Sequence, residues 1–134
     1  MAKKDPALEL ILSLLLRLTS PLKSIPVQTA DGVVFIRPER VAYMTFDNQR
    51  LVIREIDGST WHRFDSLTDM EKRLAEDPRF FRSHRSYIVN LHAVRSMIKS
   101  GSKEYRLTFN NPDIGDAGLA QSKLSQFREL MELQ

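Results

Sequence analysis

The sequence contains no cysteine, and this absence excludes disulfide bonds, cysteine nucleophiles and thiolate metal sites. It fits a reducing compartment, so we expect a cytoplasmic protein. The sequence also lacks the Walker loop, the Gly-x-Gly-x-x-Gly motif, the His-Glu-x-x-His motif and the Gly-x-Ser-x-Gly motif. We therefore expect no enzyme activity, no cofactor, no metal site and no small-molecule substrate.

Histidine is scarce, with three residues in the chain. His62 lies within a strand pattern and His92 in a turn, and both fit surface positions. His84 differs because polar and cationic residues flank it on both sides. A phosphodiesterase that uses His84 as its base is the enzymatic alternative, although a metal site would need partner ligands that the sequence does not place nearby.

No apolar run reaches the roughly 20 residues that a membrane-spanning helix needs. The longest, from residue 7 to residue 18, is leucine-rich and is interrupted by Glu9 and Arg17. Asp5 and Pro6 suit the start of a helix, and Pro21 ends it. Its leucines cover nearly the whole circumference, so the helix must be buried on more than one side. It could pack on its own domain, on a second subunit or on a missing domain.

The 134 residues suffice for one ordinary domain. We divide the chain into residues 1–23, the leucine-rich helix and a linker, and residues 24–134, a β-rich domain. Short runs of β-branched and aromatic residues predict strands. These runs are Ile25 to Thr29, Val33 to Ile36, Val41 to Phe46, Leu51 to Ile56, Thr60 to Phe64, Tyr87 to Leu91, Val94 to Lys99 and Glu104 to Phe109. Asp31-Gly32, Asn48-Gln49 and Asp57-Gly58 predict turns between them.

Two helices interrupt or close this pattern. Ser66 and Asp69 have the spacing of a capping box in front of a short helix that ends by Asp77-Pro78. Leu124, Phe127, Leu130 and Met131 form an apolar stripe, which predicts a C-terminal helix. The expected architecture is mainly β, with strands stacked in small sheets and a few short helices.

The stretch from Phe80 to Leu91 joins a polar, cation-rich turn to a pattern typical of a buried strand. The polar residues are Arg82, Ser83, His84, Arg85 and Ser86. Such a turn on a rigid scaffold is typical of a recognition loop. Arginine can bind a guanine edge or a phosphate, and imidazole or a serine hydroxyl can donate to either. The turn therefore suits an anionic, hydrogen-bonding partner.

Charge is unevenly distributed along the chain. Residues 79–106 contain seven Lys or Arg and one acidic residue, a net charge of +6, whereas the whole chain carries +3. A basic region on a mixed surface is expected of a protein that binds phosphate, although an anionic membrane would also attract it. The alternative is an ordinary solvated face.

The order of elements from Ile25 onward, and above all Phe-Phe-Arg-Ser-His-Arg-Ser-Tyr-Ile-Val-Asn-Leu at residues 80–91, resembles the LytTR family of bacterial DNA-binding domains. The resemblance covers about 110 of the 134 residues. It implies an elongated stack of about ten β-strands with a short internal helix. It also implies the output domain of a two-component response regulator, which binds double-stranded DNA at paired direct repeats through loops that enter successive major grooves.

The same resemblance assigns contact positions in this sequence. One contacting loop falls on Asn48, Gln49 and Arg50, and the central loop on His84 and Arg85. Ser66 matches a phosphate-side position, where a helix N-terminus would suit an anion. Arg82 and Ser83 complete the expected central contacts.

The third contact loop departs from the family pattern. Ala120 stands where a serine is usual, and Ser122 falls where a base-reading arginine would be. Gln121, Lys123 and Ser125 are left as substitutes, because glutamine can pair with adenine and lysine with guanine or phosphate.

The sequence thus predicts a DNA-binding transcription regulator, and an RNA or polyanion binder that uses the same basic loop is the alternative. The acidic pocket of a receiver domain is absent from this sequence. We therefore expect control by a separate regulatory protein or by a receiver domain outside this chain. The leucine-rich helix is the expected site of homodimerisation.

Overall fold

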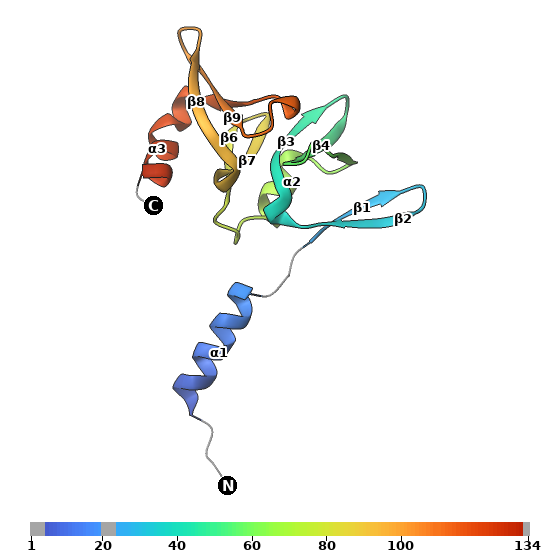
Figure 1. The fold of residues 1–134 in the computed structure, drawn as a ribbon, viewed down its shortest axis with the longest axis vertical. Helices are drawn as coiled ribbons and strands as arrows, with labels where there is room; N and C mark the ends of the chain where they lie inside the picture. Colours follow the sequence, from blue (N-terminus) through green and yellow to red (C-terminus); the bar gives the residue numbers. More distant parts are fainter. Residues whose placement is uncertain (1–4, 20–23, 133–134) are drawn as a thin grey trace.

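The computed structural model describes residues 5–19 and 24–132 (Figure 1). Its helices are α1 Pro6–Thr19, α2 Leu67–Arg73 and α3 Leu124–Glu132. Its strands are β1 Ile25–Thr29, β2 Gly32–Ile36, β3 Val41–Asp47, β4 Arg50–Glu55, β5 Thr60–Arg63, β6 Phe80–His84, β7 Tyr87–Asn90, β8 Val94–Ser100, β9 Glu104–Phe109 and β10 Ala117–Ala120. The described chain is therefore mainly β, as the sequence predicted, and it has the ten strands that the family resemblance implied.

The strands form three antiparallel sheets. A central sheet has the order β5-β4-β3-β7-β6, a second sheet the order β10-β9-β8, and β1 and β2 make a separate hairpin. Strands that follow one another within a sheet are antiparallel neighbours, except that α2 links β5 to β6 at opposite edges of the central sheet. The chain passes from one sheet to the next through 3-10 turns, between β2 and β3 and between β7 and β8. The sheets stack because the central sheet is covered by apolar side chains on both of its faces.

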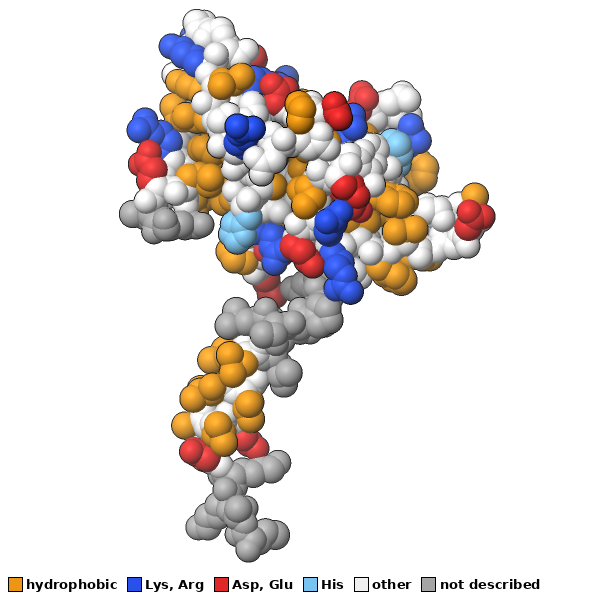
Figure 2. Space-filling model, in the orientation of Figure 1, with side chains coloured by type: hydrophobic (Ala, Val, Ile, Leu, Met, Phe, Trp, Pro, Cys, Tyr) orange, Lys and Arg blue, Asp and Glu red, His pale blue; other side chains and the backbone are white. Residues whose placement is uncertain are grey.

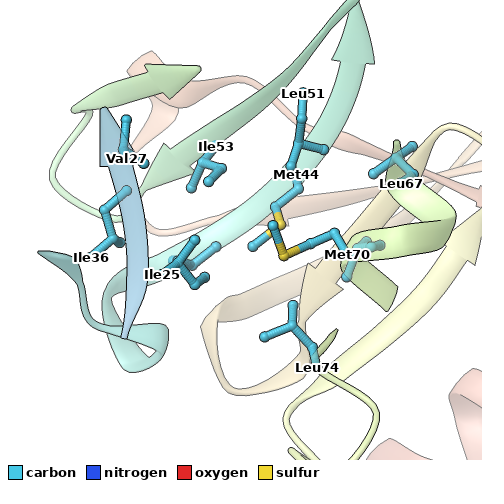
Figure 3. Close-up of a cluster of buried hydrophobic side chains, with 11 residues drawn as sticks. Ile25, Val27, Ile36, Met44, Leu51, Ile53, Leu67, Met70 and Leu74 are labelled. Atoms are coloured by element: carbon cyan, nitrogen blue, oxygen red, sulfur yellow. The ribbon is translucent and has the colours of Figure 1, made fainter. Parts of the chain in front are cut away.

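The central sheet separates two apolar cores. Alternation along β7 places Ile88 in one core and Val89 in the other. The first core lies between the central sheet, the β1–β2 hairpin and α2 (Figure 3). The second core lies between the central sheet, β9, β10 and α3, where Phe127 meets Phe81 at 6.2 Å between ring centroids. The sheet that carries the recognition turn is thus held from both sides.

Local signals in the sequence account for several turns. Asn48 and Gln49 both adopt positive φ, 52° and 65°, which is the geometry of a two-residue hairpin turn between β3 and β4. Ser66 accepts a hydrogen bond from the Asp69 backbone N–H at 3.0 Å, so the predicted cap of α2 is confirmed. At the start of α1 the Asp5 carboxylate accepts one from the Ala7 N–H at 3.0 Å.

A half-buried ion pair between Arg63 and Asp65 holds the segment in front of α2. Arg63 donates through Nη2 to the Asp65 carboxylate at 3.0 Å and through Nη1 to the Pro26 carbonyl of β1. The hydrogen bond from Arg63 holds the pKa of Asp65 below its usual value. Asp65 therefore stays charged, and the segment that leads to Ser66 is fixed to the hairpin.

Two strands were not predicted from the residue pattern. Arg82, Ser83 and His84 were expected in a turn, but they lie in β6, and only Arg85 and Ser86 form the turn. β10 was expected as part of a contact loop. Both strands are short and contain no β-branched residue.

Helix α1 stands apart from the β domain in Figure 1. Its side chains include six large apolar residues that are between 48% and 62% exposed: Leu8, Leu10, Ile11, Leu12, Leu14 and Leu15. Within residues 5–19 and 24–132, no helix has the length and apolar character to cross a membrane.

Candidate functional site

Two turns with polar side chains lie side by side at one end of the central sheet. The turn Asn48-Gln49 joins β3 to β4, and the turn Arg85-Ser86 joins β6 to β7. They adjoin because β3 pairs with β7 in an antiparallel register in which Thr45 is opposite Tyr87. Residues expected from separate parts of the sequence are thus brought together on one edge.

Arg82 fixes the shape of the Arg85-Ser86 turn. Its guanidinium donates from Nε to the His84 carbonyl at 2.9 Å and from Nη2 to the Arg85 carbonyl at 2.5 Å. Its Nη1 donates to Glu71 of α2 at 3.0 Å. The side chain is only 17% exposed. The sequence predicted that Arg82 contacts a partner directly, which stays a prediction; in the structure its bonds hold the turn in place.

Other groups hold the same turn. The Thr45 hydroxyl donates to the Ser86 carbonyl at 2.8 Å. The Ser86 backbone N–H donates to His84 Nδ1 at 3.0 Å, so the neutral imidazole carries its proton on Nε2. The His84 ring also meets the Tyr87 ring edge-on, at 5.8 Å between centroids. His84 is therefore half-buried and oriented, with Nε2–H as its free donor.

Arg85 is the exposed cation of this turn. Within the part of the chain that the structure describes, its guanidinium makes no hydrogen bond or ion pair. Its backbone is fixed by Arg82, whereas its side chain is free to bind. Arg85 is thus the exposed charge-bearing group of this turn that could bind an anion or a base edge.

A hollow of about 300 Å³ lies beside the turn. Its lining combines one aromatic ring, three hydroxyls and two guanidinium groups, from Phe46, Ser66, Leu67, Thr68, Arg82, Arg85 and Ser86. The Ser66 oxygen accepts the capping hydrogen bond, so its O–H can donate into this space. The sequence had singled out Ser66, but it gave no signal for Thr68 or Phe46, which reach the hollow only through the fold.

The expected residues of the first turn are accessible. Asn48 and Gln49 are exposed, and Arg50 at the start of β4 is half-buried. Positive φ at both turn residues makes the turn tight. These amides can donate and accept, as a base edge requires.

Ser83 is not accessible, which corrects its assignment as a contact. Its side chain has no exposed surface, and its hydroxyl donates to the Gly118 carbonyl of β10 at 2.8 Å. A Cβ added at Gly118 would lie 3.3 Å from the Tyr87 ring, so β10 passes close behind the turn. Ser83 therefore connects β6 to β10 and supports His84 from behind.

The third expected region lies along β6, in the 3-10 turn and first residues of α3. Gln121, Ser122 and Ser125 are exposed, whereas Lys123 is half-buried with its Nζ 5.9 Å from the centre of the Phe81 ring. Lys123 lines a second hollow of about 280 Å³, together with Arg82 and Glu71. Arg82 thus separates this region from the Arg85-Ser86 turn.

Several cations of the basic segment, residues 79–106, are paired with acidic side chains in the folded chain. Arg79 pairs with Asp77 at 3.0 Å, Arg82 with Glu71 at 3.0 Å, and Arg106 with Asp116 at 2.9 Å. The hydrogen bond to Asp116 raises the pKa of Arg106 further. The exposed cations that remain in this segment are Arg85 at the turn and Arg95, Lys99 and Lys103 on β8 and its hairpin.

No group of three metal-ligating side chains occurs among residues 5–19 and 24–132. His62 and His92 are exposed and lie outside the turn region, in β5 and in the 3-10 turn after β7. A larger hollow of about 390 Å³ includes His92 and lies at the end of β7 and β9, away from the two polar turns. It contains none of the expected contact residues.

Comparison with known proteins agrees with the fold described above. A family model described as the LytTr DNA-binding domain matches residues 31–132. Comparison with curated proteins gives no match. Similar solved structures include the LytTr DNA-binding domain of a methyl-accepting/DNA response regulator from Bacillus cereus, with 24% sequence identity and a TM-score of 0.68. That likeness covers 81% of this chain and 97% of the other, and it shows a shared fold.

Proposed function

Because the chain belongs to the LytTR family of DNA-binding domains, we propose that it is a transcription regulator that recognises specific sequences in double-stranded DNA. The observation that carries the proposal is the paired turns at one end of the central sheet, with Arg85 exposed and His84 fixed in orientation. A free guanidinium can form two hydrogen bonds with a guanine edge, and Nε2–H of His84 can donate to a base acceptor.

We further propose which residues contact which part of the DNA duplex. The amides of Asn48 and Gln49 would read one stretch of a major groove, and Arg85 with His84 the adjoining stretch. Gln121 and the neighbouring hydroxyls would supply the third contact. Ser66, with its free O–H beside Arg85, suits a backbone phosphate. Two such domains on paired direct repeats, joined through α1, make up the proposed complex.

The proposed setting is the cytoplasm, where DNA is accessible. The proposed input comes from a separate regulatory protein or a receiver domain, because none of the described elements forms the doubly wound fold of a receiver.

The function can be tested with labelled nucleic acids. Sites selected from a random duplex pool should contain direct repeats about one helical turn apart. Single-stranded DNA and RNA of the same sequences should bind more weakly. Retention of single strands alone would favour the RNA or polyanion alternative, and cleavage of the probe would favour the phosphodiesterase.

Arg85→Ala should weaken binding to the selected duplex by about 1–3 kcal/mol, because it removes contacts to a base edge. The unfolding free energy should change by less than about 0.5 kcal/mol, since the side chain is exposed and unpaired within the described residues. Arg95→Ala on β8 removes an exposed arginine elsewhere and is the matched control. Fluorescence anisotropy measures the DNA affinity of both variants. If Arg85→Ala binds the duplex as tightly as the unchanged chain, the Arg85-Ser86 turn takes no part in recognition.

Arg82→Gln should also weaken specific binding, by about tenfold, because the carbonyls of His84 and Arg85 lose their donors and the turn loosens. If Arg82 only positions the turn, the slope of log affinity against log salt stays unchanged. A direct phosphate contact would instead flatten that slope by about 0.9. Glu71→Gln, which leaves both carbonyl bonds in place, should have a smaller effect.

A further inference from the structure

We propose that the outer face of the β1–β2 hairpin, formed around Val33 and Phe35, is a docking surface for helix α1 of a second copy of this chain. The inference rests on the proposed α1-mediated dimer and states where the remaining apolar surface of α1 is buried.

Helix α1 has two apolar sides. Successive helical residues are about 100° apart, so Leu10 and Leu14 lie on one side and Leu8 and Leu12 on the opposite side. All four are between 48% and 62% exposed, and Figure 2 shows hydrophobic side chains along the visible length of the helix. A single partner helix covers only one of these sides. A second apolar contact is therefore needed.

The length of α1 leads to the same requirement. It has 14 residues, and isolated helices of about 12–15 residues are marginal in water. A stable dimer typically buries about 800 Å² on each partner, which is more than one side of a helix about four turns long supplies. A pair of α1 helices thus needs additional surface from elsewhere in the chain.

The β1–β2 hairpin offers such a surface. Its inner side chains, Ile25, Val27 and Ile36, are buried in the first core. Alternation puts Val33 and Phe35 on the other face, where they are 48% and 65% exposed. Their cross-strand neighbours are Gln28 and Pro26, so this face carries no charge. An apolar helix suits it better than a nucleic acid does, because DNA is bound by cationic and hydrogen-bonding groups.

A second copy is the occupant that satisfies both requirements. In a symmetric dimer every contact occurs twice, so two α1 helices that pair along one side can each dock the other side on the partner's hairpin. The hairpin follows directly after the segment that leads from α1. The two surfaces are therefore available in equal number in each chain.

The first test is the dimer dissociation constant of the full-length chain, measured by sedimentation equilibrium. Phe35→Ser should raise it by about tenfold or more, because each dimer loses two apolar contacts. Ile98→Ser is the matched control, since Ile98 is 48% exposed and lies in β8, in a different sheet from the hairpin. Its dissociation constant should equal that of the unchanged chain. Melting temperatures check that both variants are folded.

The second test uses the absence of cysteine, which makes single-cysteine variants unambiguous. A chain with Leu10→Cys or Leu12→Cys is mixed with a chain carrying Phe35→Cys under a mild oxidant. One of the two helix positions should form a disulfide-linked dimer with residue 35, and the other should not, because it faces the paired helix. Neither should link to a chain carrying Ile98→Cys.

The outcomes separate this inference from the dimer itself. A dimer that is unaffected by Phe35→Ser and gives no cross-link to residue 35 overturns the hairpin contact and leaves the α1 dimer standing. A full-length chain that stays monomeric overturns both. A monomer that sediments with phosphatidylglycerol vesicles would identify α1 as a membrane-surface helix and would likewise overturn the docking proposal.

Discussion

Phe81→Ala should lower the free energy of unfolding by about 3–5 kcal/mol and abolish DNA binding through loss of the fold. Phe81 is 7% exposed in the second core, where its ring lies against Phe127. It belongs to β6 and is paired with Val89 of β7. The cavity would therefore open directly beneath the strand pair that carries the Arg85-Ser86 turn.

Urea denaturation measures the change, and Phe64→Ala is the control because that ring is 89% exposed. The control should lose less than about 0.5 kcal/mol. A Phe81→Ala protein that keeps its stability but no longer binds DNA would instead indicate that the ring stacks on bases. That outcome would favour the alternative in which the chain binds RNA or another single strand.

Local residue patterns predicted part of the fold. Strands with β-branched or aromatic alternation, such as Val41–Asp47 and Glu104–Phe109, were predicted nearly to the residue. The turns at Asn48-Gln49 and Asp57-Gly58 were predicted as well, because asparagine, aspartate and glycine tolerate the backbone conformations of tight turns. These signals are local and need no knowledge of neighbours.

β6 was missed because what makes it a strand is not local. Ser83 is buried only because its hydroxyl reaches the Gly118 carbonyl, 35 residues away, and Arg82 is covered because it meets Glu71 of α2 and two carbonyls of its own turn. A polar sequence with such partners looks like an exposed loop until the partners are placed. β10 was missed for a related reason, since its small residues leave no pattern to recognise.

The sequence pointed to the residues of the candidate site but not to their exposure or their ion pairs. The sequence singled out the residues of both turns as contacts, which stays a prediction, and the pairing of β3 with β7 sets the two turns at the same end of the sheet. Arg85 is exposed, whereas Arg82 is engaged by backbone carbonyls. The charge count along residues 79–106 overstated the basic surface, because acids from α2 and from the segment before β10 pair with two of those arginines. Ion pairs between residues that are distant in the sequence depend on the fold, so a count of charges along the sequence does not show them.

Both apolar cores support the strand that follows the Arg85-Ser86 turn. Ile88 and Val89, adjacent in β7, anchor the same strand in opposite cores. We therefore expect a cavity in either core to disturb Tyr87 and the turn that precedes it. Substitutions far from the DNA can weaken binding by this route without touching a contact residue.

Removal of residues 1–20 should weaken binding to two repeats by about 10²–10⁴-fold, while binding to a single half-site stays nearly unchanged. Both core clusters consist of residues from Ile25 onward, so the β domain should remain folded without α1. Two domains joined through α1 bind the second repeat at high effective concentration, and separated domains lose that advantage. Melting temperature, light scattering and anisotropy on one-site and two-site duplexes provide the measurements.

The two-site duplex with a spacing changed by half a helical turn is the control for this deletion. The full-length chain should lose most of its advantage on that duplex, because the two domains can no longer face their repeats together. The shortened chain should be indifferent to the spacing, since each domain binds independently. If the full-length chain is already monomeric at concentrations on the order of ten micromolar, or binds both spacings equally, α1 does not link the two domains.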